Sequence, residues 1–271
     1  MNNKTRETIA TEALTALDQS RQIEAFTKRF PQFDVAEAYA VASSIRHKRQ
    51  TRGEKQIGRK IGFTNRSIWD EYNINAPVWG DMYDHSVRPL NSEQPVSLAP
   101  FCEPQIEPEI VFRLSGVPQE DMDEYALFEC VELVGHGFEI VQSIFPGWAF
   151  KVPDTIAGFG MHGTLLLGPT LRVTLQNRDS LFASLPNFKV TLSCDGKPVD
   201  HGQGSNVLGG PLTALRHLIG LLARDPHNPP LRAGEIITTG TITRAFRVKN
   251  GENWTTAISG IDLPDLALRF G

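Results

Sequence analysis

The chain has 271 residues, 40% apolar and 21% charged, with a formal net charge of -4. This composition is typical of a soluble globular protein, and the slight acidic surplus is not the basic pattern of a nucleic-acid binder. No run approaches the roughly 18 apolar residues of a membrane span, and the N-terminus lacks the apolar core of a signal peptide. Cys102, Cys130 and Cys194 are odd in number and widely spaced, which argues against a disulfide framework or a thiolate zinc site. We therefore expect a cytoplasmic protein that binds neither nucleic acid nor membrane.

The first 50 or so residues have a helical pattern. Apolar residues recur at helical spacing: Ile9, Ala13, Leu14 and Leu17. Asp34 lies three residues before Glu37, the spacing of a helix capping box, and Gly53 is a suitable end for the helix that follows. These features predict a helical N-terminal lobe.

From Ile57 onward, short β-prone runs alternate with turn residues. The predicted strands are Ile106–Leu114, Thr164–Leu167, Leu171–Leu175, Lys189–Cys194, Glu235–Thr239 and Ala267–Phe270. Pro211–Arg224 has the apolar face of a helix, and Asp121–Val134 is a second candidate helix. This order predicts an α+β protein in which the helical lobe precedes a mainly antiparallel β body.

Glu107 and Glu109 flank Pro108 in a predicted strand. Side chains alternate along a strand, so both carboxylates project from one side. Neighbouring carboxylates repel each other unless a positive charge lies between them, and carboxylate oxygens suit Mg²⁺ or Mn²⁺. A solvated strand face is the alternative interpretation, since Glu residues are mostly exposed.

Two further charged residues lie in apolar surroundings. Glu139 follows Gly137-Phe138, where an unpaired charge would be costly, so either an ion pair or a metal is expected. Lys60 lies in a β-like stretch between glycines and could hold a substrate carboxylate or transfer a proton. A surface lysine with a partly buried stem is the alternative.

The stretch Gly158–Gly163 matches the spacing GxGxxG. A dinucleotide fingerprint needs a strand before it and a helix after it, whereas a β-prone run follows here. We therefore interpret these glycines as a tight turn or a pocket wall.

Taken together in order, these segments resemble the fumarylacetoacetate hydrolase superfamily, in particular its 2-oxopent-4-enoate hydratase and 4-oxalocrotonate decarboxylase branch. The resemblance covers nearly the whole chain. It rests on Ala38-Tyr39, Lys60-Ile61-Gly62-Phe63-Thr64, Glu107-Pro108-Glu109, Phe138-Glu139-Ile140, Asp154-Thr155-Ile156-Ala157, Pro211-Leu212-Thr213-Ala214-Leu215 and the stretch from Leu231 to Thr241.

The resemblance implies a metal-dependent lyase of aromatic-compound catabolism that acts as a hydratase or a decarboxylase. Its fold would be a mixed β-roll, with the helical lobe and lysine motif in residues 1–85 and the metal-binding domain in residues 86–271. Members of the family tend to be homo-oligomers, so we expect one here.

The same resemblance implies roles for individual residues. Glu107, Glu109 and Glu139 would hold Mg²⁺ or Mn²⁺, which would stabilise enolate charge on a 2-oxo or 2-hydroxy-dienoate acid. We expect this small substrate to contact Lys60, Trp79 and Thr241.

The chain departs from the branch at two places. An aspartate usually follows the proline that here is Pro77, but this chain has Val78, and Asp81 or Asp84 could replace the missing carboxylate. The small polar residues of the Gly-rich stretch are here Met161 and His162. Because histidine titrates near neutral pH, we hypothesise that His162 supplies the missing proton transfer.

Two other functions remain open. An acylpyruvate-type C–C bond hydrolase needs a base that activates water, for which His136 and His162 are the candidates. A metal-binding homologue that has lost activity would be consistent with Val78.

Overall fold

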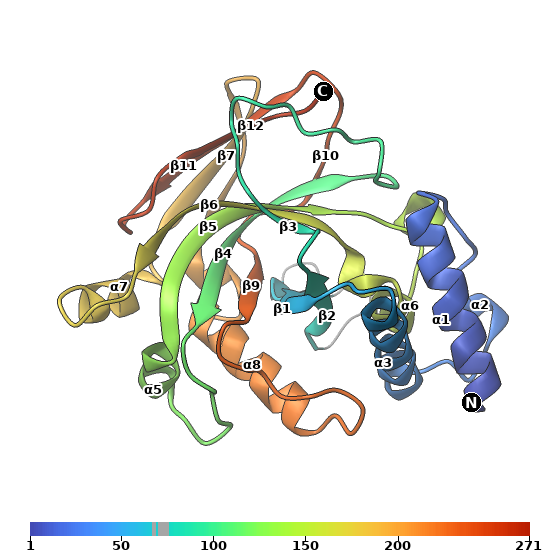
Figure 1. Ribbon diagram of the computed structural model, residues 1–271. Helices are drawn as coiled ribbons and strands as arrows, with labels where there is room; N and C mark the ends of the chain where they lie inside the picture. The colour runs from blue at the N-terminus through green and yellow to red at the C-terminus, as the bar shows by residue number, and fades with distance from the viewer. Residues whose placement is uncertain (67–68, 70–75) are drawn as a thin grey trace.

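A computed structural model describes residues 1–66, 69 and 76–271. Figure 1 shows a long curved sheet flanked by a helical lobe on one side and a smaller sheet on the other. The helices are α1 (Asn3–Asp18), α2 (Phe26–Arg29), α3 (Val35–Thr51), α5 (Glu124–Glu129), α6 (Val152–Ala157), α7 (Arg178–Ser184) and α8 (Pro211–Ala223), with 3₁₀ turns η2 (Pro146–Trp148), η3 (Phe159–Met161) and η4 (Gly204–Asn206). Among the described residues, no helix is both long enough and apolar enough to cross a membrane.

The helical lobe is formed by α1, α2 and α3 together with α6, which comes from later in the chain. The predicted capping of α3 is confirmed, because the Asp34 side chain accepts a hydrogen bond from the Glu37 N–H at 2.9 Å. The Glu37 carboxylate instead reaches α1 and accepts from Arg6 Nε at 2.7 Å. Gly53 follows the end of α3 with φ +87°, as the predicted helix stop requires. Asp154, at the start of α6, accepts from the Thr27 N–H at 2.9 Å and so joins α2 to α6.

The large sheet has eight strands within the described residues, in the order β2-β1-β9-β4-β5-β6-β3, with β10 beside β4. Their bounds are β1 (Gln56–Gly62), β2 (Val78–Tyr83), β3 (Val87–Pro89), β4 (Gln105–Leu114), β5 (Val131–Val141), β6 (His162–Arg172), β9 (Ile236–Thr241) and β10 (Phe246–Arg247). The second sheet has the order β12-β11-β7-β8, from β7 (Lys189–Cys194), β8 (Lys197–Gln203), β11 (Asn253–Ser259) and β12 (Leu266–Arg269).

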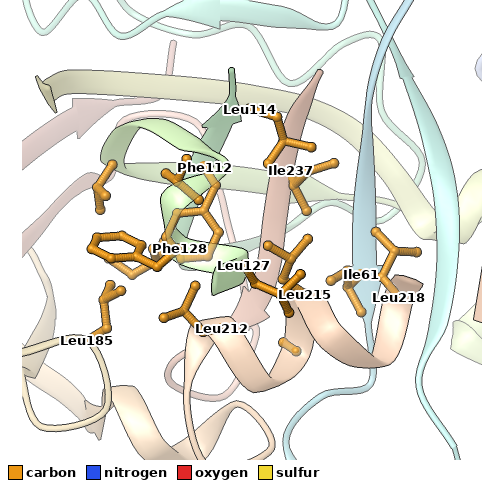
Figure 2. Close-up of a cluster of buried hydrophobic side chains, with 14 of the residues drawn as sticks. Ile61, Phe112, Leu114, Leu127, Phe128, Leu185, Leu212, Leu215, Leu218 and Ile237 are labelled. Carbon is orange, nitrogen blue, oxygen red and sulfur yellow. The ribbon is translucent and has the colours of Figure 1, made fainter. Parts of the chain in front are cut away.

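The main core lies between one face of the large sheet and the helices α5 and α8. Leu212, Leu215 and Leu218 recur along α8, and Figure 2 shows them facing Ile61 of β1 and Ile237 of β9. All five side chains are buried. This packing turns one face of β1, β9 and β4 toward apolar residues and leaves the other face for polar groups.

The structure agrees with the predicted fold class but differs from the prediction in one helix and in the pairing of some strands. The α+β class with an N-terminal helical lobe is confirmed, but the sheet is less purely antiparallel than predicted, since β1 pairs with β9 and β3 with β6 in parallel. Of the helix expected over Asp121–Val134, only Glu124–Glu129 is helical, as α5. The rest of the prediction was wrong, because β5 begins at Val131, where β-branched valines favour a strand. The boundary predicted at residue 85 falls between β2 and β3, which belong to one sheet.

Candidate metal centre and its cavity

Three glutamates converge on one face of the large sheet. Glu107 and Glu109 lie two residues apart on β4, so they project from the same face. Glu139 of β5 pairs directly with Glu107 in the antiparallel register, where opposite Cβ atoms are neighbours. One carboxylate oxygen from each of the three lies within 4.8 Å of the others. The arrangement brings together the three ligands that the sequence predicted.

The cluster is held by hydrogen bonds from outside it. Gly240 of β9 donates its N–H to Glu109 Oε2 at 2.7 Å. His162 lies 2.7 Å from Glu139 Oε1 through Nδ1, and Lys60 Nζ lies 3.4 Å from Glu139 Oε2. Glu109 Oε1 and Glu139 Oε2 are buried without a hydrogen-bond partner among the described residues. Buried carboxylate oxygens are normally paired, so this donor set fits a divalent cation.

The titration of the cluster reflects this excess of negative charge. Burial raises the pKa of Glu107 to about 7 against the opposing charge of Lys60, and burial together with Glu139 raises the pKa of Glu109 well above its usual range. At Glu139 the effect of burial is outweighed by Lys60 and His162, which lower its pKa to about 2. Burial alone would lower the pKa of Lys60, but the three carboxylates raise it. Lys60 alone therefore does not neutralise the cluster, which is the electrostatic setting of a metal site.

A cavity of about 280 Å³ opens at this cluster. Lys60, Glu107, Thr241 and Arg244 are polar groups along its wall. The apolar part of the lining comprises Ile61, Phe63, Val141, Trp148, Phe150, Met161 and Ala245. A small cavity with apolar walls and a few convergent charges is typical of a site for a small organic acid.

Lys60 is held in this cavity by its neighbours in the sheet. It pairs with Thr238 of β9, which in turn pairs with Val111 of β4, so Lys60 projects from the same face as Glu109. Gly160 has φ +62° and passes close to the lysine stem, since a Cβ at this position would lie 3.1 Å from Lys60 Cδ. The glycine-rich stretch that matched GxGxxG is thus a wall beside the lysine, as expected, and strand β6 follows it.

Other predicted site residues lie elsewhere. Trp79 and Asp81 alternate with Gly80, which pairs with Lys60, so they project from the opposite face of the sheet. Trp79 stacks on Tyr39 with ring centroids 5.1 Å apart and is not among the described residues that line the cavity. Asp81 Oδ1 lies 3.1 Å from Arg59 Nε.

The remaining candidates are also separated from the cavity. Asp84 is exposed in the turn after β2, whereas Val78 is buried on the Lys60 side of that strand. His136 is fully buried, and its ring nitrogens contact the Glu109 carbonyl oxygen at 3.2 Å and Thr256 Oγ1 at 2.9 Å. Burial lowers the pKa of His136 to about 4. Because both ring nitrogens have partners and the residue is not among those lining the cavity, His136 is not placed to activate water there.

Sequence reasoning missed three residues of this region. Gly240 supplies a backbone donor that no side-chain pattern reveals. Arg244 follows β9 and lines the cavity, and Ser86 contacts His162 Nε2 at 2.9 Å. Only the threonine- and glycine-rich run at residues 238–241 could have indicated the first of them, through its resemblance to the family motif.

The chain belongs to the fumarylacetoacetate hydrolase family, because residues 86–266 match the fumarylacetoacetate (FAA) hydrolase C-terminal family. It is 29% identical over 262 residues to the 2-keto-4-pentenoate hydratase of Paraburkholderia xenovorans strain LB400, covering 96% of this chain and 94% of the relative. It is 27% identical over 245 residues to a 4-oxalocrotonate decarboxylase of Pseudomonas putida, covering 90% of this chain and 89% of that relative. The branch expected from the sequence is confirmed.

The fold is shared with a solved structure of the same branch. The 4-oxalocrotonate decarboxylase from Pseudomonas putida G7, complexed with magnesium and adipate, superimposes with a TM-score of 0.90 at 24% identity. The match covers 100% of this chain and 99% of that one. The helical lobe is therefore part of the shared architecture and not an addition to it.

Proposed function

We propose that this protein is a divalent-metal-dependent lyase, a hydratase or decarboxylase, that acts on a small 2-oxo or 2-hydroxy-dienoate acid. The observation that carries the proposal is the convergence of Glu107, Glu109 and Glu139 beside Lys60, at the edge of a cavity that Glu107 and Lys60 line. The relatives named above are hydratases and decarboxylases, which supports the same class.

In this proposal the three glutamates hold Mg²⁺ or Mn²⁺, whose ligands are preferably oxygen atoms. The bound ion would supply a Lewis acid that stabilises negative charge at C2 of the substrate. Lys60 of β1, which lies beside Glu139 and lines the cavity, would bind the substrate carboxylate. The apolar wall would exclude water from the carbon chain.

The relatives favour a lyase over a hydrolase, since those named above are hydratases and decarboxylases. A hydrolase needs a base that reaches a water beside the substrate. No histidine lines this cavity among the described residues, and Glu107 is its one lining carboxylate. A histidine base of the kind expected for the hydrolase alternative is therefore not part of the described cavity wall.

Val78 stands where the branch usually has an aspartate, and both lyase reactions need a proton transfer. Asp81 does not replace the missing carboxylate, because it faces Arg59 on the other side of β2. We propose that the protein is active without a carboxylate at this position, with Lys60 as the ionisable side chain nearest to the reacting atoms.

A direct test combines metal binding with turnover. Purified protein stripped with a chelator should regain activity when Mg²⁺ or Mn²⁺ is added. The substrates are 2-keto-4-pentenoate and 4-oxalocrotonate, and turnover is measured as the loss of dienol absorbance. Glu107→Gln and Lys60→Ala should each lower kcat/KM by at least about 100-fold, since removal of one preorganised charged group costs ~2.7–4 kcal/mol. Glu93→Gln, at an exposed position, should leave turnover unchanged.

Measurements of metal binding and of turnover with both substrates distinguish a hydratase, a decarboxylase and a homologue that has lost activity. Water addition and CO₂ release, measured in parallel, distinguish hydratase from decarboxylase. Metal binding without turnover of either substrate would instead select the homologue that has lost activity. If Glu107→Gln kept both metal binding and turnover, the proposed site would be refuted.

We propose that the protein is a cytoplasmic homo-oligomer that acts in aromatic-compound catabolism; the resemblance to this branch implies the oligomer and the kind of catabolism. Size-exclusion chromatography with light scattering measures the oligomeric state directly.

A further inference from the structure

His162 connects the candidate metal centre to a second region of the protein. Its neighbour Met161 lines the cavity with Lys60 and Glu107, whereas His162 lines a different cavity of about 320 Å³. The ring is buried, with 6% of the residue exposed. His162 thus touches the cluster through Glu139 and does not share the cavity that the substrate would occupy.

Both ring nitrogens of His162 have fixed partners. Nδ1 lies 2.7 Å from Glu139 Oε1, and Nε2 lies 2.9 Å from Ser86 Oγ. Because a carboxylate only accepts, Nδ1 carries the proton in the first contact. The ring therefore has one orientation that satisfies both of its nitrogens.

Ser86 is itself immobilised. Its Oγ accepts from the Tyr83 N–H at 3.2 Å, and its one hydroxyl proton points either to the Tyr83 carbonyl oxygen at 3.0 Å or to His162 Nε2 at 2.9 Å. Its own carbonyl oxygen accepts from Leu165 N–H at 2.8 Å, which attaches the turn to β6. The chain of contacts thus runs from the turn after β2, through the imidazole, to the carboxylate of β5.

The two carboxylate oxygens of Glu139 therefore have different contacts. Oε1 contacts His162, while Oε2 lies 3.4 Å from Lys60 Nζ and lacks a hydrogen-bond partner among the described residues. A carboxylate held by one oxygen presents the other in a fixed direction. Such supporting contacts orient metal ligands and tune their affinity.

We propose that His162, held by Ser86, is a positioning residue that fixes Glu139 through Oε1 so that Oε2 binds the metal ion. This inference rests on the proposed function, since it assumes that the glutamates bind a cation. It replaces the proton-transfer role suggested by the sequence, because that role requires the ring to reach the substrate.

Two substitutions at one position separate the contacts of His162. In His162→Asn the amide nitrogen occupies the place of Nδ1 and keeps the bond to Glu139. In His162→Gln the amide reaches the place of Nε2, keeps the contact with Ser86 and loses Glu139. Ser86→Ala releases the ring while leaving the imidazole present.

The test measures Mg²⁺ and Mn²⁺ dissociation constants by calorimetry in the absence of substrate, with thermal melting of the metal-free proteins as a check of folding. His162→Gln should weaken metal binding by about 10- to 100-fold, the usual cost of removing a group that supports a ligand. His162→Asn should weaken binding less than His162→Gln does, and to about the same degree as Ser86→Ala, because both of these variants keep the contact with Glu139 and lose the one between residues 162 and 86. His85→Asn, at an exposed histidine of the same second cavity, should change nothing.

Several results would overturn the inference. Natural affinity in His162→Gln would show that Glu139 needs no support, and equal losses in the Asn and Gln variants would indicate a general packing effect. Normal metal binding with lost turnover in His162→Asn would restore the proton-transfer role. A natural protein that binds no metal, or a Glu107→Gln variant that binds it unchanged, would instead refute the proposed function.

Discussion

At the scale of single residues, Gly240 has two requirements that glycine alone meets. Its backbone has φ +98°, and a Cβ there would lie 1.8 Å from Thr64 Oγ1. The same residue donates its N–H to Glu109 Oε2. The geometry of one metal ligand therefore depends on the absence of a side chain on a neighbouring strand.

Gly240→Ala should accordingly destabilise the protein and weaken metal binding together. Strain of this kind costs ~1–3 kcal/mol, and the displaced N–H removes a charge-assisted hydrogen bond. Urea unfolding and metal titration measure the two effects. Gly251→Ala, which has a similar φ of +89° but no atom within 4 Å of its Cβ, is the matched control for backbone strain alone. Equal metal affinity in both variants would contradict the role of Gly240.

Arg244 provides a prediction about substrate preference. It lines the cavity, and Asp200 accepts from its Nε at 3.2 Å, while its side chain is 65% exposed. A guanidinium at the wall favours a substrate with a second carboxylate. Arg244→Ala should raise the KM for the dicarboxylate 4-oxalocrotonate by about 3- to 10-fold, a modest effect because the group is solvated. The KM for the monocarboxylate 2-keto-4-pentenoate should not change.

The control for this comparison is Arg247→Ala, an exposed arginine that lies nearby on β10 but outside the cavity lining. An equal rise in KM for both substrates in Arg244→Ala would show that Arg244 does not bind the second carboxylate.

Some of these features of the site could be predicted from the sequence, and others could not. Strand alternation placed Glu107 and Glu109 on one face, and that geometry is present. Alternation also separates Lys60 from Asp81, but seeing this requires the β1–β2 register, which the sequence does not reveal. The hydrogen bond from Gly240 depends on a positive φ and on a strand far away in sequence, so the motif at residues 238–241 could mark the glycine but not its contact with Glu109.

At the scale of elements, α1 and α3 are joined through Glu37. Arg6 hydrogen-bonds this carboxylate and, against the effect of burial, lowers its pKa to about 2. The helices and the capping of α3 were predictable from periodicity and spacing. This cross-link was not, because it depends on how two helices pack.

The pH dependence of stability should report the link. A carboxyl whose pKa is lower in the folded state stabilises the protein fully above its unfolded pKa of 4.5, and this contribution is lost as pH falls toward 2. Glu37→Gln should therefore reduce the free energy of unfolding by about 2 kcal/mol at pH 7 and by much less at pH 3, allowing for partial exposure. Urea titrations at both values measure this. Glu24→Gln, at an exposed position, should show no such difference, and a constant deficit in Glu37→Gln would contradict the assignment.

At the scale of the whole molecule, metal binding should stabilise the fold. A ligand that binds only the folded state adds about 2.7 kcal/mol at 100 times its Kd. Mg²⁺ or Mn²⁺ should thus raise Tm by several degrees, and a chelator should reverse the shift. Glu109→Gln should abolish the dependence on metal, whereas Glu93→Gln should retain it. A shift that persists in Glu109→Gln would place the stabilising ion elsewhere.

The parallel pairing of β1 with β9 has a consequence for the order of folding. Lys60 emerges early during synthesis, but the strand that holds it against β4 comes from near the other end of the chain. Contacts so distant in sequence close slowly, because the entropy of the intervening loop must be overcome first. A nascent chain that stops before Ile236 would contain the three glutamates on the paired strands β4 and β5, but not the strand that places Lys60 beside them and donates to Glu109. We therefore infer that the complete site forms only after β9 has left the ribosome, close to the end of synthesis.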